Sequence, residues 1–205
     1  MQAIKDQFFS RHNPRFIPIL RHARIGIAGA GGLGSNVAVT LVRTGIGALV
    51  IADFDRVEAS NLNRQQFFLS QLGEAKVDAL KSNLEKIHPF TLLEMHQIRI
   101  NEENVVPIFG QCDILIEAFD TAESKEMLIE TWCSAFPKKP IIVGSGLAGV
   151  GNNNALKTRQ SGTLYICGDE KTQLQGRISP MAPRVGIVAN MQANCALEIL
   201  FKGIQ

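Results

Sequence analysis

The sequence predicts an α/β fold: a doubly wound, mostly parallel sheet with helices on both faces and an antiparallel extension near the C-terminus. Three observations support this prediction. From Arg24 onward, short β-branched runs alternate with longer helical patterns, which is typical of parallel strands joined by helices. The first strand pattern leads directly into a glycine-rich turn that opens a helix. A second Gly/Asn-rich turn, GLAGVGNNN, leads into two strand patterns that we expect to be antiparallel.

Local signals mark each element in turn. The helix after the first strand ends at Gly45, where a left-handed residue is favoured. The next helix carries its apolar residues on one face and ends at Pro89. The predicted elements, in chain order, are strand 24–30, helix 32–45, strand 48–53, helix 73–89, strand 91–100, helix 102–111, strand 112–119, helix 122–136, strand 140–145, strands 155–160 and 163–168, and helix 183–201.

Composition excludes several classes of function. The chain has 205 residues, 45% of them hydrophobic, so we expect one compact domain over 1–205. Its 21 basic and 19 acidic residues nearly cancel, which argues against nucleic-acid or membrane partners. No run is long enough to span a membrane, and the polar N-terminus does not resemble a secretory signal, so we expect a cytoplasmic protein. The four cysteines form no CxxC pair, so neither zinc nor a disulfide framework is expected.

The glycine-rich turn indicates a Rossmann-like nucleotide site. Gly29, Gly31 and Gly34 follow a strand and begin a helix, where phosphates can approach the backbone amides at the helix N-terminus. Asp53 ends the second strand and is placed to accept hydrogen bonds from ribose hydroxyls. Because NAD and ATP both carry ribose and phosphate, this turn alone leaves the two nucleotides open.

A polar insert after Asp53 favours ATP. Asn61, Arg64, Gln65 and Lys76 offer planar donors and two cations, which suit a triphosphate whose charge grows on the leaving pyrophosphate. A nicotinamide cofactor requires no such contacts.

A further acid, Asp120, ends the fourth strand pattern at the expected carboxyl edge of the sheet. There it could hold Mg²⁺ against the phosphates. A second reading is open at this point, because an Asp in this position can also be the N-cap of the following helix.

Four motifs occur together and in order: GAGGLGS, DFDRVEASNLNRQQ, GEAKV and EAFD. With them the chain resembles the ThiF/MoeB family, which is related to ubiquitin-activating enzymes, and most of all a short ThiF branch of it. The resemblance implies ATP-dependent adenylation of the C-terminal glycine of a ubiquitin-like, ThiS-like sulfur carrier with a Gly-Gly end. By the same resemblance, pyrophosphate would be released and the product would serve synthesis of the thiazole of thiamin.

The resemblance also implies roles for particular residues. Arg64, Lys76 and Asp120 would be catalytic, with Asp120 binding Mg²⁺ or positioning the reacting carboxylate. A short N-terminal helical arm would supply Arg11 to the partner site of a homodimer, with Arg15, or a plain surface role for Arg11, as the alternatives. The nucleotide-binding residues would be Gly29, Gly31, Gly32, Gly34, Asp53, Asp55, Asn61, Arg64, Gln65 and Lys76.

The chain departs from the family pattern in two places. It lacks the paired cysteine knuckles that hold zinc in larger members, so we expect no zinc. Lys125 stands where the family usually has an arginine, and the two side chains do not make the same contacts. Some relatives use a cysteine covalently; Cys167 is the candidate here, but burial is the favoured explanation for it.

Other functions remain to be tested. The carrier could be of the molybdopterin-synthase type or another ubiquitin-like protein, because carrier identity depends on surface complementarity. An NAD-dependent oxidoreductase or a non-catalytic nucleotide-binding module is the alternative from a different class. For the carrier tail, the loops at 146–151 and 172–183 are the candidate lining.

Overall fold

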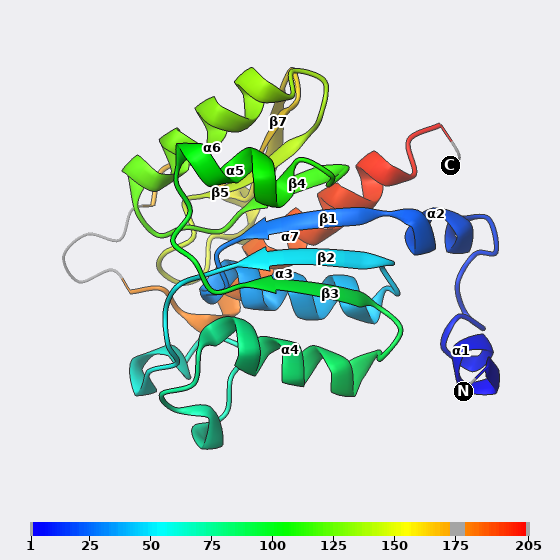
Figure 1. The fold of residues 1–205 in the computed structure, drawn as a ribbon. Coiled ribbons are helices and arrows are strands. Elements are labelled where there is room, and N and C mark those ends of the chain that lie inside the picture. The colour runs from blue at the N-terminus through cyan, green and yellow to red at the C-terminus, as the bar shows by residue number, and fades with distance from the viewer. Residues whose placement is uncertain (1, 173–178, 204–205) are drawn as a thin grey trace.

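A computed structural model describes residues 2–172 and 179–203. Its centre is a seven-stranded sheet with the order β3-β2-β1-β4-β5-β7-β6 (Figure 1). The strands are β1 (Arg24–Ala28), β2 (Ala48–Ala52), β3 (Leu92–His96), β4 (Ile114–Glu117), β5 (Ile141–Ser145), β6 (Lys157–Ser161) and β7 (Leu164–Gly168). The helices are α1 (Gln2–Phe8), α2 (Phe16–His22), α3 (Gly32–Arg43), α4 (Lys76–Ile87), α5 (Glu102–Phe109), α6 (Ala122–Ala135) and α7 (Ala182–Leu200), with 3₁₀ turns η1 (Ala59–Asn61), η2 (Leu69–Gln71) and η3 (Asn153–Ala155).

The strand directions confirm the predicted fold class. All neighbouring pairs from β3 to β7 are parallel, and β6 alone runs antiparallel to β7. The chain winds outward from β1 through β2 to β3, then returns to β4 on the other side of β1. This reversal between β1 and β4 is the point at which open α/β sheets bind ligands.

Helices cover both faces of the sheet. The core on one face joins α3, α4 and α7 to residues such as Ile27, and these helices lie together on one side of the sheet in Figure 1. The core on the other face joins α5 and α6 to residues such as Leu115. Because successive side chains of a strand point to opposite faces, the buried strands supply apolar residues to both cores.

Several predicted elements were longer than the observed ones, and two of them show the physical reason. The helix expected from residue 73 begins at Lys76, because Ala75 pairs with Arg56 in an isolated β-bridge. The strand expected over 91–100 ends at His96, which pairs with Ala52 at the end of β2, so no partner strand continues beyond it.

The N-terminal helical arm lies at the amino ends of the strands, on the right in Figure 1. Phe8 of α1 packs against the buried ring of His88, with 4.1 Å between the ring centroids. His12 approaches the carbonyl oxygen of Thr44, just beyond the last turn of α3, at 3.2 Å. The arm therefore sits at the end of α3 remote from the glycine-rich turn.

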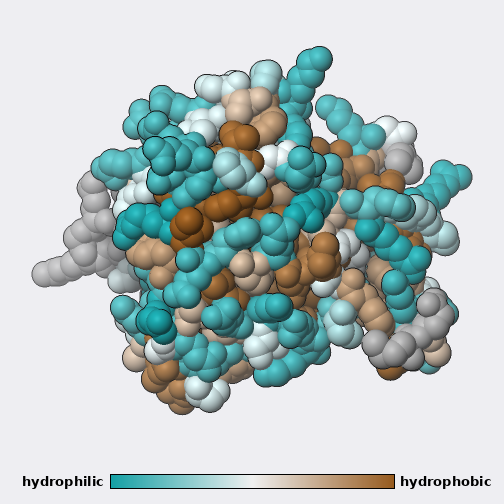
Figure 2. All heavy atoms as spheres, viewed as in Figure 1, coloured by the Kyte–Doolittle hydropathy of each residue, from teal (hydrophilic) through white to brown (hydrophobic). Residues whose placement is uncertain are grey.

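The surface in the view of Figure 2 is mostly hydrophilic, with apolar residues in patches. Among the described residues, no helix has the length and apolar character that crossing a membrane requires.

Candidate functional site

The glycine-rich turn lies where β1 gives way to α3, beside the end of β4. Gly29 has a φ of 103°, and a Cβ there would stand 2.8 Å from the carbonyl oxygen of Ala118. A Cβ on Gly34 would stand 1.8 Å from the carbonyl oxygen of Gly29. These two glycines are therefore required for the turn itself to pack.

Gly31 has a different environment. A Cβ placed on it would meet only one atom, the side-chain nitrogen of Gln65 at 3.9 Å. The space above this part of the turn is therefore open. Gly32 is closer to its surroundings, since its Cβ would lie 3.2 Å from Val185 and 3.7 Å from the side chain of Arg64.

The carboxylate of Asp53 holds the turn in shape. It accepts a hydrogen bond from the amide of Ala30 at 2.6 Å and another from the amide of Asp55 at 2.7 Å. The side chain is buried. Because a carboxylate has about four acceptor positions, these two bonds leave acceptor capacity for a ligand hydroxyl.

The insert that follows is fastened to the first turns of α3 by two polar side chains. Ser35 accepts a hydrogen bond from the amide of Gln66 at 3.1 Å and donates to the carbonyl oxygen of Gly31 at 2.6 Å. Asn36 donates to the carbonyl oxygen of Arg64 at 3.0 Å and accepts from the side chain of Gln66 at 2.7 Å. Ser35 and Asn36 were not predicted from the sequence, although two polar residues at the start of an apolar helix were a usable signal.

Gln65 of the insert has an unusual environment. Its side chain is buried, and its oxygen has no hydrogen-bond partner among the described residues. An unpaired buried polar atom is costly unless a ligand or water satisfies it. Since the same side chain is the nearest neighbour of the open position at Gly31, this buried amide fits a polar ligand above the turn.

The two cations predicted to bind the phosphates have protein partners. Lys76, at the start of α4, makes an ion pair with Asp55 at 2.8 Å, and the lysine is almost fully buried while the aspartate is half exposed. Arg64 donates to the carbonyl oxygen of Ser60 at 3.1 Å and to the side chain of Asn63 at 2.8 Å. Each cation keeps N–H groups beyond these contacts, because an ammonium has three donors and a guanidinium five.

Asn61 of the insert is buried, and its side-chain oxygen accepts a hydrogen bond from the amide of Glu58 at 3.0 Å. It therefore shapes η1 and, with it, the position of Arg64, whose amide donates to the carbonyl oxygen of Asn61 at 3.1 Å.

Asp120 stands exposed, two residues beyond Ala118, whose carbonyl oxygen would meet a Cβ on Gly29. The N-cap of α6 is Thr121, whose hydroxyl accepts a hydrogen bond from the amide of Ser124 at 3.3 Å. The capping role left open for Asp120 is thus filled by its neighbour. Within the described part of the chain, Phe119 and Thr121 form hydrogen bonds on either side of it, and the Asp120 carboxylate forms none.

Comparisons with known proteins identify the family of the chain. A model of the ThiF family matches residues 9–204. The chain belongs to the ThiF family. It is 31% identical over 189 residues to the adenylyltransferase and sulfurtransferase UBA4 of Eremothecium gossypii, and this match covers 89% of the chain but 42% of that protein. It is 30% identical over 127 residues to a probable adenylyltransferase/sulfurtransferase MoeZ of Mycobacterium tuberculosis, covering 62% of the chain and 32% of that protein.

Solved structures show the same fold. The E. coli tRNA N6-threonylcarbamoyladenosine dehydratase TcdA, solved in complex with ATP, superposes with a TM-score of 0.84 at 19% identity and covers 95% of this chain and 92% of its own. This ThiF-family chain spans less than half the length of each of the two curated relatives.

Among the predicted site residues of this ThiF-family chain, Arg11 lies away from the glycine-rich turn. It is exposed in the N-terminal arm, next to His12, which contacts the far end of α3. The 12 residues of α3 separate that end from the glycine-rich turn, a length of about 18 Å at 1.5 Å per residue. Within one chain Arg11 is therefore remote from the site.

A buried ion pair braces the loops beside the site. Arg184 of α7 lies 2.7 Å from Asp169 and donates to the carbonyl oxygen of Gly151 at 2.7 Å. Burial raises the pKa of Asp169, but hydrogen bonds from Thr172 and from backbone amides, with the charge of Arg184, lower it overall to about 2. This pair holds the end of β7, the loop after β5 and the start of α7 together.

Cys167 is fully buried on β7 in this ThiF-family fold. A hydrogen bond with the neighbouring thiol of Cys195 lowers the pKa of Cys167, and the same contact raises the pKa of Cys195. Its burial agrees with the structural role favoured for it, and a covalent role for Cys167 stays a hypothesis. Among the described residues, no group of three or more His, Cys, Asp or Glu side chains is arranged to hold a metal ion.

Proposed function

We propose that residues 1–205 form one nucleotide-binding adenylation domain that uses ATP to adenylate the C-terminal glycine carboxylate of a ubiquitin-like carrier protein, releasing pyrophosphate. The ThiF family match and the names of the relatives support the reaction class. The neighbouring fold solved with ATP supports the choice of nucleotide.

One observation carries the proposal: the glycine-rich turn is open above Gly31, and the buried side-chain amide of Gln65 next to it has an oxygen with no partner among the described residues. Lys76 and Arg64 bring two cations to the insert beside the turn, and Asp120 follows the neighbouring strand with its carboxylate unpaired in the described part of the chain. An anionic, polar ligand suits this set better than a nicotinamide ring does.

In the proposed complex, the backbone of the turn and Gln65 contact the phosphates, and Asp53 accepts hydrogen bonds from the ribose. Arg64 and Lys76 neutralise the β- and γ-phosphates, while Asp55 keeps Lys76 in place through their ion pair. Asn61 sets the backbone position of Arg64.

Mg²⁺ fits this site. Mg²⁺ is commonly bound by one or two carboxylates together with substrate phosphates, and Asp120 offers an exposed carboxylate with no partner among the described residues. Asp120 would hold the ion, which supplies charge neutralisation on the phosphate oxygens.

The reaction requires alignment more than proton transfer. The glycine carboxylate is already anionic near neutral pH, so one of its oxygens attacks the α-phosphorus without a general base. A new O–P bond forms as the bond from the α-phosphorus to the β-phosphate oxygen breaks. The chain's own residues hold the two reactants in line and stabilise the charge that grows on the departing pyrophosphate.

We further propose that the carrier is a ThiS-like sulfur carrier of thiamin thiazole synthesis, with a molybdopterin-synthase-type carrier as the alternative. The carrier tail would lie along the loop at 146–151, where the glycines permit close approach of an extended peptide. The second candidate lining, at 172–183, includes residues 173–178, which lie outside the described residues. We propose a homodimer as well, since Arg11 lies far from the site of its own chain.

Carrier-dependent exchange of label between pyrophosphate and ATP tests the function directly. The assay uses purified protein, Mg²⁺ and carriers that end in Gly-Gly, with the same carriers lacking the last glycine as controls. We expect exchange with the intact carrier only. Tight NAD binding without ATP binding would instead support an oxidoreductase. ATP turnover that depends on tRNA and not on a carrier would place this chain with the function named for TcdA.

A further inference from the structure

The last residue of β4, Glu117, has a carboxylate that is completely buried. Burial raises the pKa of Glu117, and the charge of Lys125 opposes that shift. Lys125 of α6 approaches both carboxylate oxygens at 2.8 Å. A buried ion pair is costly to assemble and contributes little net stability compared with apolar packing, so its position in the fold requires an explanation.

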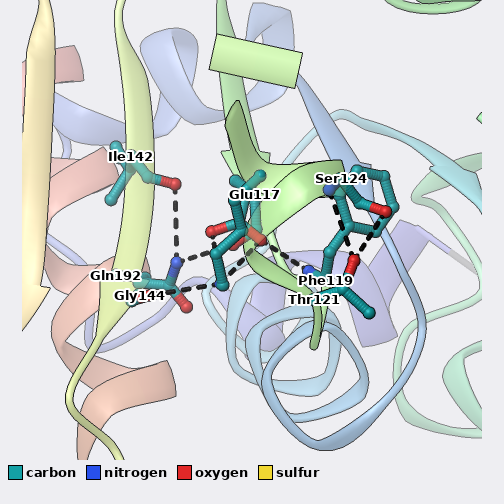
Figure 3. Close-up of polar contacts among 8 residues, drawn as sticks. Glu117, Phe119, Thr121, Ser124, Ile142, Gly144 and Gln192 are labelled. Carbon is teal, nitrogen blue, oxygen red and sulfur yellow. Dashed lines mark hydrogen bonds and ion pairs between the residues drawn. The ribbon is translucent and has the colours of Figure 1, made fainter. Parts of the chain in front are cut away.

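The explanation lies in what the pair does to the chain that follows it. Glu117 accepts a hydrogen bond from the amide of Phe119 at 2.6 Å (Figure 3). On the other side of Asp120, the hydroxyl of Thr121 accepts a hydrogen bond from the amide of Ser124 and caps α6. The backbone is thus fixed immediately before and immediately after Asp120. An apolar side chain at position 117 could fill the same volume but could not accept the Phe119 amide.

The same cluster ties this short segment to its neighbours. Lys125 also donates to the carbonyl oxygen of Gly144 on β5 at 3.2 Å. Gln192 of α7 donates to the main-chain carbonyl oxygen of Glu117 at 3.0 Å (Figure 3). Elements on both faces of the sheet therefore fix the end of β4.

A second strand end in this site is built in the same way. Asp53, directly after β2, accepts from the amide two residues further along the chain, as Glu117 does. Asp53 thus fixes the backbone that leads to Asp55, and Glu117 fixes the backbone that leads to Asp120.

We propose that Glu117 and Lys125 are positioning residues for Asp120: their ion pair fixes the backbone from 118 to 121 so that the Asp120 carboxylate is held toward the open turn. In this proposal Lys125 contacts Glu117 and does not contact the nucleotide. This inference rests on the proposed function for its catalytic consequence, but its structural part can be tested independently.

The structural test is amide hydrogen exchange of the whole protein. In Lys125→Met, we expect the amide of Phe119 to exchange about tenfold faster than in the wild type, because Glu117 loses its counter-ion and no longer holds this hydrogen bond as firmly. Lys125→Arg, which keeps the charge, should restore most of the protection. The control is Arg159→Met, which breaks the exposed ion pair with Glu170 and should leave the exchange of the Phe119 amide unchanged. Unchanged protection in Lys125→Met would overturn the proposal, whether or not the protein adenylates anything.

The catalytic test uses the exchange assay. We expect Lys125→Met to lower kcat about 10- to 100-fold, as for a misplaced catalytic group, with KM for ATP within about twofold of the wild type. In an Asp120→Asn background the same change should have little further effect, because Lys125 acts through Asp120. Additive losses in the double variant would contradict a positioning role. A wild-type protein with no exchange would refute the proposed function and leave the amide-exchange result to decide the structural part.

Discussion

Arg64 makes its side-chain contacts within its own short segment, with Ser60 and Asn63. Arg64→Ala should therefore change the melting temperature little, yet lower carrier-dependent exchange about 100-fold, because it removes charge stabilisation from the leaving pyrophosphate. The measurement is kcat in the exchange assay beside a thermal melt. Full activity in this variant would remove Arg64 from the proposed site.

Asp169 makes stability depend on pH. Its pKa falls from 3.8 to about 2 in the folded protein, so its ionised form stabilises the fold at pH values above the unfolded pKa. That contribution is lost as the pH falls from about 4 through about 2. At pH 7, Asp169→Asn should lower the free energy of unfolding by about 2 to 5 kcal/mol, since it also leaves Arg184 buried without its counter-ion.

Urea unfolding at several pH values checks this prediction. The difference between the wild type and Asp169→Asn should shrink as the pH drops below about 4. Glu170→Gln, in the exposed pair with Arg159, is the matched control and should show little effect. A constant difference at every pH would show that the Asp169 charge is not the source of the stability.

At the scale of elements, hydrogen bonds from α3 hold the insert. Asn36→Ala removes two of these bonds, to Arg64 and Gln66, and should lower the free energy of unfolding by about 1 to 2 kcal/mol. We expect KM for ATP to rise in the same variant, because Arg64 and Gln65 are less well held. Thr40→Ala, which removes a bond from the same helix to Asn190, should not raise KM. An equal rise of KM for ATP in both variants would indicate a general disturbance of α3 and not the loss of the Asn36 bonds to the insert.

The order and type of the elements could be predicted from the sequence, because the alternation of strand and helix patterns is a local property. The antiparallel pair β6 and β7 was also predicted, since a Gly/Asn-rich turn precedes it. The attachment of the insert to Ser35 and Asn36 was not, because those bonds join residues about 30 positions apart. The contact of Lys125 with buried Glu117 was missed for a related reason: the burial that makes it important comes from β5 and α7.

The sequence predicted which residues form the candidate site better than it predicted the contacts between them. The sequence placed Gly29, Asp53 and Asp120 at strand ends, and the sheet brings these ends together at one edge. It did not reveal that Asp53 builds the turn through the amides of Ala30 and Asp55. Nor did it show that the Asp120 N-cap alternative fails, which depends on the turn geometry at Thr121.

At the scale of the whole molecule, the N-terminal arm and the glycine-rich turn lie at opposite ends of α3 (Figure 1). If Arg11 serves the site of a partner chain, Arg11→Ala and Arg64→Ala should each lose most of the exchange activity when assayed alone. Mixing them after dissociation should restore about one quarter of the wild-type sites, because half of the dimers are mixed and each has one intact site. The measurement is exchange activity of the mixture. No recovery, with mixed dimers confirmed by mass, would rule out action in trans.

The carboxylate of Asp53 accepts one hydrogen bond from the amide of Ala30, in the glycine-rich turn, and another from the amide of Asp55, in the chain after β2. The protein's own bonds therefore restrict the conformations that the turn can adopt. Such preorganisation spares the conformational entropy that a flexible loop would lose on binding. Affinity at this edge of the sheet then depends on the contacts that the ligand makes, and association need not wait for a loop to fold.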